Sequence, residues 1–130
     1  MERYEIRLKS LENGGYTDTV ITETEKYDEI SLSAEVGERL FSEKDEDQFT
    51  AFKKLRDSLL TAGYGMCCAG ALINALQSGM MAGSDRVYLV TLGEKPSLKD
   101  AVGIFDFADT ERFPDSTEQT EFTENYFESI

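Results

Sequence analysis

Apolar and charged side chains alternate at the start of the chain. Tyr4, Ile6 and Leu8 occupy every second position of residues 3–9, and charged residues fill the positions between them. Successive side chains of a strand point to opposite faces, so this pattern predicts a strand with one buried and one wet face.

Two more strands are predicted before residue 40. The turn cluster Asn13-Gly14-Gly15 readily adopts positive φ, and residues 17–24 are rich in β-branched side chains, which indicates a returning strand. Residues 29–33 predict a third strand, and the apolar content continues less regularly through Val36, Leu40 and Phe41. We therefore expect an antiparallel sheet in the first third of the chain.

The main helix is predicted at residues 46–62. Its apolar residues recur at helical spacing, and they are Phe49, Phe52, Leu55 and Leu59. Ser42 or Asp45 is expected to cap the helix, and the acids that follow place negative charge at its positive end. Gly63 follows as a residue suited to the left-handed position after a helix.

Three strands are predicted after the helix, at residues 64–68, 86–92 and 102–107. Residues 71–76 form either a strand or a helical turn, because periodicity does not separate the two over so short a run. The order of strands, helix and strands predicts an α+β domain over residues 1–108, with an antiparallel sheet of about five or six strands and one main helix packed on it.

The composition changes near residue 109. Residues 109–130 contain seven acids, one base and several aromatic side chains. A purely solvating tail would contain few aromatic residues, so the rings either dock on the domain or are available to a partner. We expect a docked acidic tail.

The net charge is the strongest feature of the composition, with 26 acids, 13 bases and a formal charge of −13. A negative field repels nucleic acid and attracts a basic partner. The same charge could serve solubility alone, so both interpretations stay open.

The residue types required by several catalytic and metal sites are missing. The chain has no histidine, which excludes Ser-His-Asp catalysis and zinc sites that use imidazole. The acids from Asp45 onward do not fit a calcium loop, because its sixth and twelfth positions are Thr50 and Arg56. We expect no enzyme activity, no cofactor and no metal.

Cys67 and Cys68 are adjacent in an apolar stretch, which predicts buried and reduced thiols. No apolar run approaches the ~20 residues of a membrane-spanning helix. The first five residues also lack the basic and then apolar pattern of a secretory signal. We therefore expect a cytoplasmic protein without membrane contact.

About half of the chain, residues 50–108, resembles a family of small uncharacterised bacterial proteins. The matching features are a helix that ends in glycine, a Cys and Gly segment, a Ser-Gly-Met turn and an Ile-Phe-Asp segment. They retain Cys68, Gly70, Ser78, Gly79, Met80, Gly93 and Phe105. The chain departs from the family at Ala69, Leu72 and Gln77, where the family has Asn, Arg and Pro. Such proteins are similar to the immunity proteins of bacterial polymorphic and contact-dependent toxin systems.

The resemblance and the charge together favour an immunity protein that covers a basic toxin domain, for example a nuclease. Acidic side chains would pair with Arg or Lys of the toxin, and aromatic side chains would anchor the contact. The residues expected at this interface are Glu43, Asp45, Glu46, Asp47, Asp115, Glu118, Glu121, Phe122 and Tyr126. For the acids at the start of the main helix, compensation of the helix dipole is the interpretation that we favour over partner binding.

Two other functions stay open. The first is a non-catalytic regulator or adaptor that binds a small ligand around Gly70 and residues 78–80, because glycine allows close approach to the backbone. The second is an enzyme that uses carboxylates, although no pattern organises the acids into a site.

Overall fold

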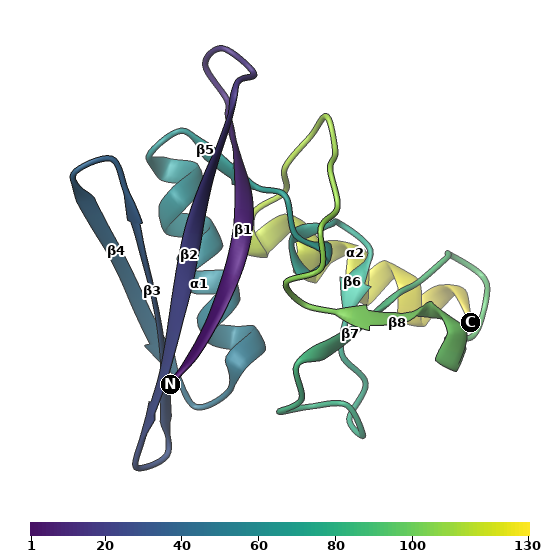
Figure 1. Ribbon diagram of the computed structural model, residues 1–130. Coiled ribbons are helices and arrows are strands. Elements are labelled where there is room, and N and C mark those ends of the chain that lie inside the picture. Colours follow the sequence, from purple (N-terminus) through teal and green to yellow (C-terminus); the bar gives the residue numbers. More distant parts are fainter.

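The computed structural model describes all of residues 1–130, and its main layer is a curled antiparallel sheet of five strands in the order β4-β3-β2-β1-β5 (Figure 1). The strands are β1 (Glu2–Ser10), β2 (Tyr16–Lys26), β3 (Glu29–Val36), β4 (Arg39–Asp45) and β5 (Tyr64–Met66). Ile6 and Leu8 are buried and the charged residues between them are exposed, which confirms the alternation predicted for the first strand. The weakly patterned residues after Val36 form β4, a strand of their own.

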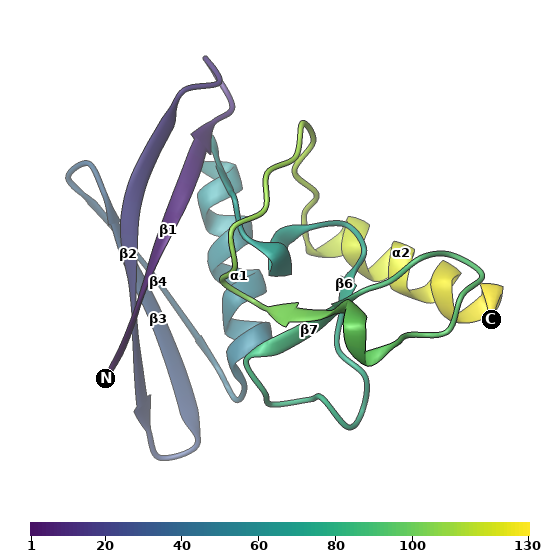
Figure 2. The ribbon, with the colours of Figure 1, turned by 45° about the vertical axis from the view of Figure 1, so that its right-hand side comes forward.

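The predicted main helix is confirmed as α1 (Gln48–Thr61), which lies between the five-stranded sheet and the rest of the molecule (Figure 2). All four residues of its predicted apolar stripe are buried. The cap is Asp47 and not Ser42 or Asp45, because β4 continues to Asp45 and delays the start of the helix. Gly63 adopts a φ of 95°, the left-handed conformation expected after the helix.

A second sheet of three short strands, in the order β6-β7-β8, follows the helix. Its strands are β6 (Ala75–Leu76), β7 (Arg86–Leu89) and β8 (Ala101–Gly103). The ambiguous residues 71–76 contain the end of a 3₁₀ turn (Ala69–Ala71) as well as β6. The last strand is shorter than predicted because the chain turns after Gly103, whose N–H donates to the Asp106 carboxylate at 2.8 Å. The α+β class is confirmed, and the strands divide between two sheets.

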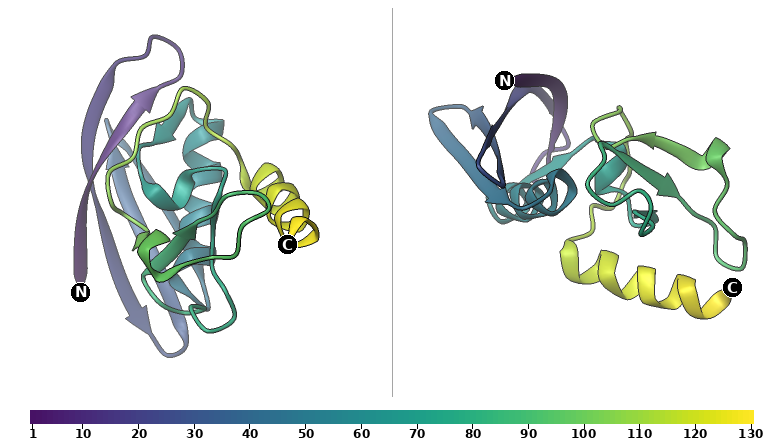
Figure 3. Two further views of the ribbon diagram at one scale, coloured as in Figure 1. Left: turned by 90° about the vertical axis from the view of Figure 1, so that its right-hand side faces the viewer. Right: turned by 90° about the horizontal axis from the view of Figure 1, so that it is seen from below.

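The acidic tail contains a second helix, α2 (Ser116–Ser129), which its sequence pattern does not predict. In Figure 3, α2 begins near α1 and runs along the small sheet to the end of the molecule. Asp115 caps α2, and Glu118 completes a capping box with it. The tail is thus an ordered element with two distinct sides.

Two apolar clusters hold the fold together. The larger one joins the five-stranded sheet to α1 and includes Leu8, Ile21, Phe52 and Leu59. The smaller one contains Leu76 and Val90 from the small sheet region and Tyr126 from α2. No helix of the structure is both long and apolar enough to cross a membrane.

Candidate partner-binding surface

The acids at the start of α1 are largely engaged in local contacts. The Asp47 carboxylate accepts hydrogen bonds from the backbone N–H of Thr50 at 2.8 Å and from its hydroxyl at 3.0 Å. Asp45 lies 2.7 Å from Lys54 Nζ, and hydrogen bonds from Lys54 and from the Glu46 backbone lower the pKa of this carboxyl. Asp45 and Asp47 therefore stabilise the junction between β4 and α1 and have little free charge to offer a partner.

Glu43 and Glu46 are the other expected interface residues of this segment. Glu43 lies on β4 and is half-buried, whereas Glu46 is exposed at the turn before α1. Neither carboxylate forms an ion pair. Glu46 is thus the freest acid of residues 43–47.

The two expected acids at the start of α2 also have local partners. The Asp115 carboxylate accepts a hydrogen bond from the Glu118 N–H at 2.9 Å, and Glu118 reaches back to the Asp115 N–H. Glu118 additionally pairs with the exposed Arg112 at 3.2 Å. Capping thus accounts for Asp115 and Glu118.

The expected aromatic anchors are turned toward the molecule. Tyr126 is 0% exposed, and its hydroxyl donates to the Glu94 carbonyl oxygen at 2.6 Å. Burial raises the pKa of this phenol, and the charges of Asp100 and Glu94 act in the same direction. Phe122 packs against the same cluster. The expectation that Tyr126 contacts a partner is therefore corrected, because its ring forms part of the core.

The neighbouring Phe127 is the aromatic residue that α2 presents to solvent, with 51% of its surface exposed. It follows Tyr126 directly, so it points about 100° away around the helix. The Gly93 N–H donates to Ser129 Oγ at 2.8 Å, which brings the exposed Leu92 to the same end of α2. Phe127 and Leu92 were not among the residues expected from the sequence.

The outer side of α2 carries three glutamates without partners. At about 100° per residue, Glu121, Glu124 and Glu128 fall within about 60° of one another around the helix, beside Phe127. All three are exposed, and none takes part in an ion pair or a side-chain hydrogen bond. We call Glu121, Glu124, Phe127 and Glu128 the acidic face of α2.

The charges of this acidic face lower the stability of the free protein. Like charges three and four residues apart on a helix repel each other, and negative charge near a helix C-terminus opposes the helix dipole. The helix contains no basic residue that would offset these effects. Of the acidic face, only Glu121 was among the expected residues. The other three residues share a side with Glu121 only when the tail is a helix.

A buried polar network fixes α2 against the domain. The Arg56 side chain is 1% exposed, and its guanidinium donates to the Asp57 carboxylate at 2.8 Å and to Gln119 Oε1 at 2.6 Å. The amide nitrogen of Gln119 donates to the carbonyl oxygens of Gly70 and Leu72. The contacts at Gln119 and the burial of Tyr126 hold α2 at two points about two turns apart, so its outer side is presented on a rigid support.

One depression is lined both by an expected acid of residues 43–47 and by an acid of α2 that was not expected. Asp47, which caps α1, and Glu124 of α2 both line this depression of about 300 Å³. Lys53 lies in the same depression, stacked on the Phe49 ring at 4.8 Å, and burial lowers the pKa of its ammonium group. Asp115, Glu118 and Glu121 do not line this depression.

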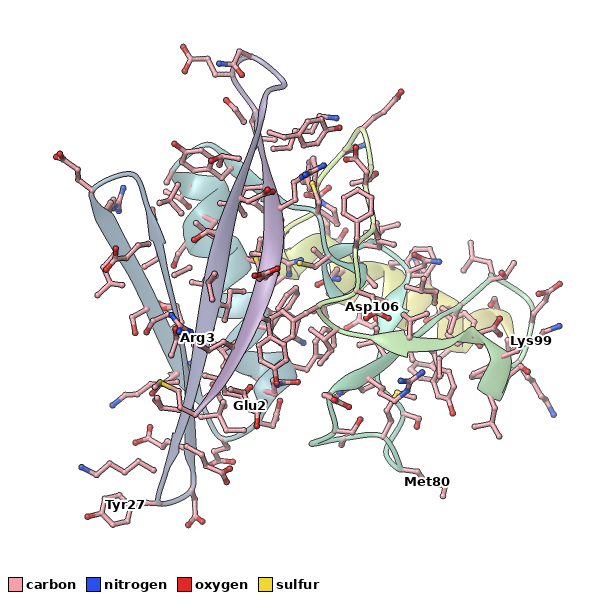
Figure 4. The ribbon with its side chains drawn as sticks, viewed as in Figure 1. Glu2, Arg3, Tyr27, Met80, Lys99 and Asp106 are labelled. Atoms are coloured by element: carbon pink, nitrogen blue, oxygen red, sulfur yellow. The ribbon has the colours of Figure 1, made fainter.

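Gly70 and residues 78–80 were considered as a site for a small ligand, and at Gly70 neighbouring side chains fill the space. A side chain at Gly70 would meet Ile104 at 2.9 Å and Phe52 at 3.1 Å, so close approach of helix and turn explains this glycine. Met80 is 100% exposed at the tip of a loop (Figure 4). No group of three or more His, Cys, Asp or Glu side chains is placed to hold a metal ion.

Cys67 and Cys68 are both free and buried, as the apolar stretch around them predicts. Burial raises the pKa of the Cys67 thiol to about 11, with the nearby Asp109 carboxylate acting in the same direction. Burial also raises the pKa of Cys68. A raised thiol pKa disfavours the reactive thiolate.

We expect the native protein at pH 8 to react with a thiol reagent such as DTNB far more slowly than the unfolded chain, in which two thiols should react at once. Folding keeps the Cys67 thiol protonated above its ordinary pKa of 9.0, so its contribution to stability should be lost as pH rises from about 9 to about 11. Urea titrations between about pH 9 and about pH 11 measure whether the free energy of unfolding falls as expected. A rapid reaction of both thiols in the native state would contradict their burial.

The sequence matches no known family model and no curated protein.

Proposed function

We propose that this chain is an immunity protein that binds a basic toxin domain and neutralises it. The observation that carries the proposal is the acidic face of α2, three exposed glutamates without partners beside an exposed phenylalanine. Large exposed aromatic side chains within a charged rim are typical anchors of protein interfaces. The like-charge repulsion on the free helix is relieved when a basic surface covers it.

The net charge of −13 extends the range of this attraction. A strongly negative protein steers a basic partner toward itself and raises the association rate at low ionic strength. Basic residues gather around the active sites of enzymes that act on phosphate backbones, such as nucleases. Carboxylates of α2 would occupy these positions in place of phosphate groups, and the enzyme would be blocked.

Calorimetric titration with the purified product of the gene that neighbours the gene of this chain tests the proposal. We expect a 1:1 complex whose association constant falls as salt is raised from about 50 to 500 mM, because exposed charge pairs are screened over this range. The toxin's activity should fall to zero at one equivalent of this chain. Absence of binding at every salt concentration would exclude the proposal.

A further inference from the structure

Strand β1 has one edge that is only partly covered. It pairs with β2 from Glu2 to Lys9, whereas β5 pairs only with Leu8, Lys9 and Ser10 on the other side. The Cys67 N–H still donates to Arg7 O, but no strand continues the line of β5 toward the start of β1. The first half of β1 is therefore an open sheet edge.

The backbone groups at this edge can be assigned from the hydrogen bonds around it. In an antiparallel sheet the N–H and C=O of one residue face the same neighbour, and successive residues alternate between neighbours. The Ser10 N–H donates toward β2, to Gly15 O at 2.7 Å, while Arg7 O accepts from Cys67 N–H at 2.9 Å on the β5 side. Arg3 and Glu5 are in phase with Arg7, so their N–H and C=O groups face the open edge.

A groove of about 600 Å³ reaches this edge from the sheet, where Glu5, Ile6 and Arg7 of β1 and Asp18, Thr19 and Val20 of β2 line it. Its far wall is formed by Phe105 and Phe107, and Phe107 is 65% exposed. Hydrogen bonds hold this wall in place, including one from Ala108 N–H to Cys67 O at 3.1 Å. Figure 4 shows Glu2 and Arg3 at the start of β1 and Asp106 on the segment of the far wall.

We propose that the open edge of β1 binds an extended segment of another polypeptide, which continues the line of β5. The free N–H and C=O groups of Arg3 and Glu5 would supply the main-chain hydrogen bonds of an added strand. Alternate side chains of that segment would pack on Phe105 and Phe107, because side chains of a strand alternate between faces.

The charges of the groove select a basic segment. Arg7 is paired with Asp18 at 3.0 Å, so the positive charge in the groove is compensated. Glu5 lines the same groove and forms no ion pair. A strand with alternating basic and β-branched residues therefore matches both the carboxylate and the aromatic wall.

The far wall also favours a single strand over a second copy of this chain. A second copy would bring its own β2 together with β1, and the segment from Ile104 to Ala108 already bounds that side of the groove. The inference does not depend on the proposed function, because α2 does not line the groove.

The test uses the full chain and a capped peptide with the sequence Lys-Val-Lys-Val-Lys-Val, with amide hydrogen exchange followed by NMR. We expect exchange at Arg3 and Glu5 to slow by about tenfold or more when the peptide binds. The free edge of β4 is the internal comparison, since its Leu40 and Ser42 amides face away from β3 and should be unaffected.

The variant Glu5→Pro removes an N–H that the fold does not use, and proline is tolerated at such edge positions. We expect it to weaken peptide binding by about tenfold or more, whereas the matched edge variant Leu40→Pro should bind as the unmodified chain does. If Glu5→Pro does not fold, exchange in the unmodified chain decides the question.

Three results would overturn the inference. The first is no binding of the peptide at about 1 mM, and the second is protection confined to α2, which reports attraction to the acidic helix alone. The third is protection of Arg3 and Glu5 in a dimer without peptide, which assigns the edge to a second copy. None of these results depends on a toxin, so failure here is distinct from failure of the proposed function.

Discussion

Replacing Tyr126 with alanine should lower the free energy of unfolding by about 3–5 kcal/mol, the cost typical of truncating a buried aromatic side chain. Tyr126 is the α2 residue of the smaller apolar cluster, where it meets Leu76 and Val90. Its hydroxyl also satisfies the Glu94 carbonyl oxygen. Chemical denaturation monitored by circular dichroism measures the loss, and hydrogen exchange should show that the α2 amides open first.

Two variants serve as controls for this prediction. Tyr126→Phe keeps the ring and removes the hydrogen bond, so we expect a loss of about 0.5–1.5 kcal/mol. Phe127→Ala changes the adjacent, exposed ring and should cost about 0.5 kcal/mol or less. If Phe127→Ala proved as destabilising as Tyr126→Ala, the orientation described for α2 would be wrong.

The sequence predicts the first half of the fold well because its patterns are long and regular. β1 alternates over residues 3–9, and α1 has four apolar residues at helical spacing that pack on the sheet. The small sheet is harder to predict, since β6 contains two residues and a periodicity does not show in so short a strand.

The second helix escapes prediction for a physical reason. Its buried side includes Gln119, a polar residue held by Arg56 and by two carbonyl oxygens, so the apolar stripe is interrupted. Asp115 and Glu118 form a capping box, which is the one local signal in the tail for a helix. Because the helix was missed, the sequence did not show that Tyr126 faces inward and Phe127 outward.

The central claim is that the acidic face of α2, and not the acidity of the chain as a whole, recognises the partner. Two triple variants separate these causes. Glu121→Gln, Glu124→Gln and Glu128→Gln together neutralise the face. Glu12→Gln, Glu25→Gln and Glu38→Gln neutralise three exposed acids elsewhere that form no ion pair. Each set removes three negative charges, so the net charge goes from −13 to −10 in both.

The two properties of the α2 variant should change in opposite directions. Toxin binding should weaken by about 3- to 160-fold, because each of the three exposed interfacial ion pairs contributes about 0.2–1 kcal/mol. Stability should stay the same or rise slightly, since neutralisation removes the glutamate repulsion and the unfavourable charge near the helix C-terminus. The control variant should change binding by no more than about threefold, the effect of reduced steering alone.

The most direct measurement is the dissociation constant of the toxin complex for the unmodified chain and both triple variants at one salt concentration. The account predicts a large loss of affinity for the α2 variant alone, accompanied by the same loss in toxin inhibition and by unimpaired folding. Equal affinities for the two triple variants would contradict it, because recognition would then follow the net charge and not the acidic face of α2.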